Sequence, residues 1–123
     1  MSTLKVDTLV AADGSSPATL TKQEAAKMFA QIDGTGTVGV DISLNVSSIS
    51  DVGTGEPHPN FTNNFSSANS YVCTGATQPE TDWNDTVTWN TGGGTSRINL
   101  FTGSDGTLID LDPVGVALFG DLA

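Results

Sequence analysis

The feature of this sequence that most constrains its fold is a succession of short segments in which apolar and polar residues alternate, each ended by turn-forming residues. The clearest segments are 28–32, 37–49 and 82–90, and 114–119 is the last strand candidate. Alternation with a period of two places successive side chains on opposite faces of a β-strand. Gly, Asn, Asp and Pro between the segments favour turns. About eight or nine short strands joined in this way predict an all-β fold, an antiparallel β-sandwich or small barrel.

Two strand candidates carry further detail. Segment 37–49 predicts one long strand with Val38, Val40, Ile42, Leu44 and Val46 on one face, and the change of face at 47–49 predicts a β-bulge. Pro57 and Pro59 bracket His58 in the next candidate. Because neither proline has an N–H to donate to a ladder, we expect that strand to lie at an edge or to be broken.

The first residues differ from the rest and predict a separate arm. Leu4, Val6 and Val10 share a parity and would form one apolar stripe, suited to docking or oligomerisation. Segment 19–27 has capping-box spacing and good helix propensity, so it is the one short helix that we expect. We therefore predict a docking arm at 1–26 and a β-sandwich domain at 27–123.

Charge excludes whole classes of partner. The chain has 14 acidic and 4 basic residues and a net charge of -10. Three of the basic residues lie in the first 27 positions, which leaves Arg97 as the one base beyond them. Nucleic acids and anionic membranes are bound by clustered Lys and Arg, so we expect neither as a partner. We expect the acidic domain to present a solvated surface and the near-neutral arm to be the part that docks.

Residues that could carry catalysis are few. His58 is the sole histidine and Cys73 the sole cysteine. A general base or a catalytic triad would have to use His58, but an ordinary loop histidine is the simpler interpretation. Cys73 lies mid-strand without an electropositive neighbourhood in the sequence, which is typical of a small buried residue rather than a reactive thiol. We expect neither enzyme activity nor a cofactor.

Two binding interpretations stay open beside these. Acidic residues could supply oxygen ligands to Ca²⁺, but their spacing follows no calcium loop, and Asp also begins turns, so we expect no metal site; they are Asp82, Asp85, Asp105, Asp110 and Asp112. Trp83 and Trp89 share a parity on one strand candidate and could form a platform on which sugar rings stack. Large aromatic residues of one parity more often belong to a core.

Three blocks of the chain resemble a known family. Residues 4–9 (LKVDTL) are similar to the "LKVDTI" start of small structural proteins of tailed, marine-type bacteriophages. Residues 27–38 (KMFAQIDGTGTV) resemble their "KAWVNFNGTGTV" block, and residues 44–55 (LNVSSISDVGTG) resemble the "FNVSSITDNGTG" that follows. Residues 56–59 replace the aromatic-led strand of that family, and residues 77–95 resemble none of its blocks.

The resemblance implies a role in a virion. Proteins with these blocks are virion structural proteins or tail fibres, so it implies a β-rich, trimeric protein on a virion surface, made in the host cytoplasm. A compact capsid decoration (cement) protein and a short tail fibre both fit the length. The expected partners are further copies of the chain and capsid or tail proteins. The alternative is a carbohydrate-binding module that contacts a host surface glycan through Trp83 and Trp89.

Overall fold

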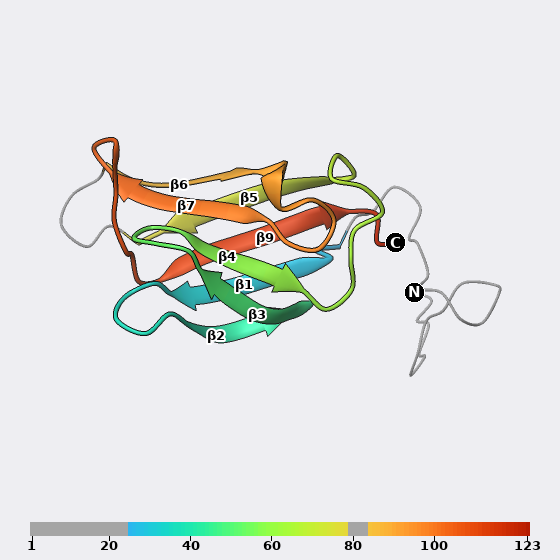
Figure 1. The fold of residues 1–123 in the computed structure, drawn as a ribbon, viewed down its shortest axis with the longest axis horizontal. Coiled ribbons are helices and arrows are strands. Elements are labelled where there is room, and N and C mark those ends of the chain that lie inside the picture. Colours follow the sequence, from blue (N-terminus) through green and yellow to red (C-terminus); the bar gives the residue numbers. More distant parts are fainter. Residues whose placement is uncertain (1–24, 79–83) are drawn as a thin grey trace, which may run out of the picture.

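The computed structural model describes residues 25–78 and 84–123, and within them the protein is all-β (Figure 1). This confirms the predicted fold class. Nine strands and one short 3₁₀ turn, η1 (Thr91–Gly93), lie in this part of the chain. The strands are β1 (Met28–Asp33), β2 (Gly39–Leu44), β3 (Val46–Asp51), β4 (Pro57–Phe61), β5 (Tyr71–Thr77), β6 (Asp85–Asn90), β7 (Asn99–Ser104), β8 (Thr107–Leu108) and β9 (Val114–Gly120).

One layer of the fold is a four-stranded antiparallel sheet in the order β2-β1-β9-β5. Its central strands come from the two ends of the described chain, since β1 pairs with β9 along most of its length. The ladder extends back to Lys27, whose backbone N–H donates to the carbonyl of Leu118 at 2.8 Å. Residues 25–27 are therefore extended or bent rather than helical, which corrects the end of the helix expected over 19–27. The rest of that segment lies outside the described residues.

The second layer contains β3-β4 and β6-β7-β8, and Figure 1 shows it in front of the first. β4 and the residues just before β7 are joined by a bridge between Asn60 and Arg97, with the Ile98 N–H donating to the carbonyl of Pro59 at 3.2 Å. A residue's N and C=O point to the same side of a strand, so the missing N–H of Pro59 faces β7. The ladder is interrupted on that side, as the prolines predict.

The long strand expected over 37–49 is instead two strands in different layers. Asn45 stands between β2 and β3 with a φ of 59°, a left-handed conformation that Asn tolerates better than most residues. Its side chain fixes the corner, because Nδ2 donates to the carbonyl of Asn63 at 3.0 Å and Oδ1 accepts from the Asn63 N–H at 2.6 Å. The predicted bulge is confirmed, since the register of β3 shifts between Val46 and Ser48.

The core lies between the layers. Met28, Ile32, Val114 and Leu118 reach it from β1 and β9, and Leu100 reaches it from β7. At one end it is closed by an aromatic cluster in which the rings of Phe61, Phe65 and Tyr71 pack at centroid separations of 4.7–6.2 Å. These edge-to-face and tilted contacts hold the 62–70 connection against both layers.

Candidate docking surface

The structure separates the residues singled out in the sequence. Leu4, Val6, Val10 and Trp83 lie outside the described residues. Trp89 is half-buried on β6 and packs against the core, with its ring centroid 6.1 Å from that of Tyr71. Because Trp83 lies outside the described residues, the glycan platform remains a prediction.

His58 is buried on the outer side of β4, where it is paired with Ser50 and lies edge-on to Phe101 at a centroid distance of 5.5 Å. Burial, followed by the positive charge of Arg97, lowers the pKa of His58 from its ordinary value, and Glu56 opposes this shift. Neither ring nitrogen has a hydrogen-bond partner among the described residues. Both nitrogens are enclosed, so this geometry does not present a base to a substrate.

Three other candidate groups are buried or hydrogen-bonded, and Asp82 lies outside the described residues. Cys73 is buried on β5, and burial raises its pKa to about 12, so the thiol stays protonated. Asp110 accepts the backbone N–H of Gly55 at 2.7 Å, and Asp105 accepts from Asn84 at 2.8 Å. Within residues 25–78 and 84–123 no group of three or more His, Cys, Asp or Glu side chains is arranged to hold a metal ion.

The most distinctive surface is the outer face of the four-stranded sheet, which we call the neutral face. The register of the ladders defines it, because residues paired across an antiparallel sheet share a face. It consists of Phe29, Gln31, Ile42, Leu44, Val72, Thr74, Ala76, Gly115, Ala117 and Phe119. None of these carries a charge, and the charged Asp33, paired with Gly39, lies at the end of the same face. The exposed fractions of the side chains of Val72, Ile42 and Leu44 are 58%, 57% and 47%.

A bulge turns two apolar residues of β2 outward. The register between β1 and β2 slips at Gln31, so that Gln31 pairs with Ile42 and Ile32 pairs with Val40. The slip breaks the single apolar face expected over 37–49, and it places Ile42 and Leu44 on the outer side while Val40 stays on the side of Ile32. The expectation of one shared face is therefore wrong for this strand.

A trough of about 390 Å³ runs along the neutral face over β9. Its floor is low because Gly115 and Ala117 have almost no side chain. Its walls are Phe29 and Gln31 on the β1 side, and Thr74 and Ala76 on the β5 side. Bulky residues stand beyond one end of the trough, where Phe119 is paired with Val72. The face thus has both a raised region and a hollow.

The outer face of the opposite layer has the usual polar character. On β6, Thr86 and Thr88 are exposed. On β4, the Asn60 side chain donates to the hydroxyls of Ser48 and Ser50 at 3.0 and 2.9 Å. Polar outer positions of this kind are what an antiparallel sheet needs when one face meets water. The neutral face has few of them, Gln31 and Thr74, and its other side chains are apolar, which is typical of a sheet that is covered on both sides.

The composition of two strands indicates this face, although alternation with a period of two does not. β1 (MFAQID) and β9 (VGVALFG) are apolar at positions of both parities. Near-continuous apolar strands indicate a sheet buried on both faces, whereas alternating strands indicate one wet face. Only the tertiary pairing shows that these strands lie side by side in one sheet.

Comparisons with family models, with curated proteins and with solved structures found no match to this chain. No helix in the described segments is long and apolar enough to cross a membrane. The neutral face itself is therefore the basis for a functional interpretation.

Proposed function

We propose that this chain is a structural protein of a tailed-bacteriophage virion surface, a compact capsid decoration (cement) protein or a short tail fibre. The observation that carries the proposal is the neutral face, an uncharged apolar sheet surface on a chain with a net charge of -10. A surface of this kind is suited to being covered by protein. The resemblance of residues 4–9, 27–38 and 44–55 to phage structural proteins supplies the setting, and it implies a trimer.

The arrangement supports assembly better than catalysis. The histidine is enclosed without an exposed nitrogen, and the thiol is buried and protonated. Chemistry on a substrate needs an accessible group with a suitable protonation state. In this proposal, the arm containing Leu4, Val6 and Val10 attaches the protein to the particle, while the sandwich is the exposed body. Glycan binding through Trp83 and Trp89 stays the alternative.

The proposal is tested by producing the tagged chain during infection by a phage that encodes it and locating it on purified particles. We expect labelled copies on intact virions, on the head or on the tail. A variant lacking residues 2–12 should fold, as judged by circular dichroism, and be missing from the particles. A protein absent from virions would contradict the proposal, and binding to isolated glycans in that case would favour the alternative.

A further inference from the structure

We propose that the neutral face pairs with the same face of a second copy of this chain, about a two-fold axis that sets β1 antiparallel to its counterpart. The inference rests on the proposal above that this face is covered by protein, and it names what covers the face. Three observations support it. They are the net charge of the chain, the two charged residues at the ends of β1, and the shape of the trough.

The charge of the chain selects the occupant. A protein with a net charge of -10 repels its own copies wherever carboxylates would face each other. The residues that form the neutral face carry no carboxylate, and the one that lies at its end, Asp33, can face Lys27 of the other copy, so two copies can meet there without that cost. A strongly basic partner would instead be drawn to the acidic parts of the surface. An uncharged apolar face on an acidic protein therefore fits another copy of the same protein.

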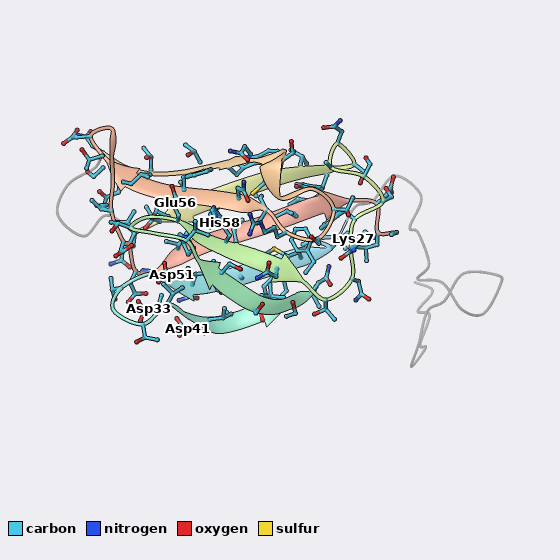
Figure 2. All side chains as sticks on the ribbon, in the orientation of Figure 1. Lys27, Asp33, Asp41, Asp51, Glu56 and His58 are labelled. Carbon is cyan, nitrogen blue, oxygen red and sulfur yellow. The ribbon has the colours of Figure 1, made fainter. Side chains whose placement is uncertain are left out.

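The ends of β1 give the direction of pairing. Lys27 precedes the strand and shares the parity of Phe29, and Asp33 ends the strand with the same parity. Figure 2 shows the two residues at opposite ends of β1. Asp33 is held as a carboxylate, because hydrogen bonds from Thr35 lower its pKa. When β1 lies antiparallel to β1 of the partner copy, Lys27 of each copy meets Asp33 of the other, twice over.

The shape of the face favours the same direction. Bulky pairs, Phe29 with Leu44 and Phe119 with Val72, stand toward one end of the sheet. Small residues, Gly115 and Ala76, are paired toward the other end. Reversing the strand direction places the bulky end of one copy over the trough of the other, so that the ring of Phe119 lies toward Gly115 of the second copy. A two-fold interface is self-complementary in this sense.

A parallel arrangement lacks both advantages. If the neutral faces surrounded a three-fold axis along the strands, Lys27 would meet Lys27 and Asp33 would meet Asp33 from the other copies. Bulky residues would stand opposite bulky residues at the same level, leaving the troughs facing each other. The inference thus separates a two-fold dimer from the trimer that the family resemblance implies.

The first test fills the trough. A Cβ added at Gly115 meets only the carbonyl oxygen of Ala76, at 3.6 Å, which is ordinary contact, and further side-chain atoms would extend into the open trough. In sedimentation equilibrium over a dilution series, the wild type should show a dimer. Gly115→Val should weaken association about a hundredfold or more. The matched control is Thr88→Val, an exposed position on the outer face of the opposite layer, which should leave the dimer unchanged.

The second test exchanges the charges. Lys27→Asp and Asp33→Lys should each weaken the dimer about tenfold, since each brings like charges together at both symmetric positions. The double variant Lys27→Asp/Asp33→Lys should recover the affinity of the wild type. Circular dichroism confirms that each variant is folded. A wild type that is monomeric throughout the dilution series, a trimer mass, or a double variant without recovery would each overturn the inference.

The outcomes for the two proposals are distinguishable. A protein that is monomeric in solution but present on virions would remove the two-fold pairing and leave the virion role standing. A dimer that forms in solution and responds to both sets of variants, but never enters particles, would leave the pairing standing and remove the virion role.

Discussion

At the scale of single residues, His58 is where folding and protonation are linked. Its side chain is 4% exposed, neither ring nitrogen has a partner among the described residues, and Arg97 adds an unfavourable positive charge. The imidazole is therefore held neutral in the folded protein. Because the pKa of His58 is lowered by folding, the unfolded chain takes up the proton first as the pH falls.

We expect the free energy of unfolding to decrease as the pH falls below about 6.5, the ordinary histidine pKa. The slope from this residue is at most about 1.4 kcal/mol per pH unit, the value for one proton. The stability lost in this way stops growing once the pH passes below the lowered pKa of the folded state. Urea unfolding at a series of pH values between 5 and 7 measures it, in a range where carboxylates contribute little.

His58→Phe is the matched control for that pH dependence. Phe keeps an aromatic ring beside Phe101, and it has no proton to gain. The free energy of unfolding of the wild type minus that of this variant should decrease as the pH falls. A wild type with the same pH dependence as the variant would show that the His58 site is open to water or gains a partner.

At the scale of the elements, the corner at Asn45 decides that one apolar run becomes two strands. Pairing with β1 on one side and with β4 on the other requires the chain to leave the first layer and enter the second. Asn45 provides the change of direction, because its backbone is left-handed and its side chain is hydrogen-bonded to Asn63. The segment therefore forms a strand on each side of the corner, β2 before it and β3 after it.

Asn45→Ala should therefore lower the free energy of unfolding by roughly 2 kcal/mol. About half of this comes from the left-handed conformation, and the rest from the two lost hydrogen bonds to Asn63. Asn45→Gly should cost less, because Gly adopts that conformation freely. Asn45→Asp, which keeps the acceptor, is the second comparison. Chemical denaturation measures all three, and equal costs for Ala and Gly would contradict the role of conformation.

At the scale of the whole molecule, the acidic surface and the neutral face are complementary parts of one arrangement. Most charge must remain in water, because burying unpaired charge is costly. Most of the acidic residues that the structure describes lie in the polar layer and the loops, and we propose that the neutral face of the other layer is used for association. A net charge of -10 also means that the folded chain repels itself.

We expect added salt to stabilise the fold at neutral pH. Raising the ionic strength from about 0.01 M to about 0.15 M shortens the Debye length from about 30 Å to about 8 Å, which screens the repulsion among carboxylates. Thermal unfolding at low protein concentration should show a higher Tm in the salt. Near pH 4, where carboxylates are about half protonated, the effect should nearly vanish. A Tm that is indifferent to salt at neutral pH would count against self-repulsion.

Parts of this fold follow from local rules, and the sequence alone was enough for them. The all-β class, the antiparallel turns, the bulge near Ser47 and the interrupted ladder at Pro59 each depend on side-chain periodicity or on a missing N–H, which are properties of a few neighbouring residues. The enclosed state of Cys73 was likewise expected from its position on a strand. The charge of the chain, and the expectation drawn from it that anionic partners are not bound, needed only composition.

The neutral face was decided by the tertiary structure alone. β1 and β9 lie far apart in the sequence yet form the centre of one sheet, and a one-residue slip at Gln31 determines that Ile42 and Leu44 point outward. Periodicity shows that a strand has two faces, but it does not show which face meets the core. That choice depends on which strands pair and in what register, and these are set by contacts between residues distant in the chain.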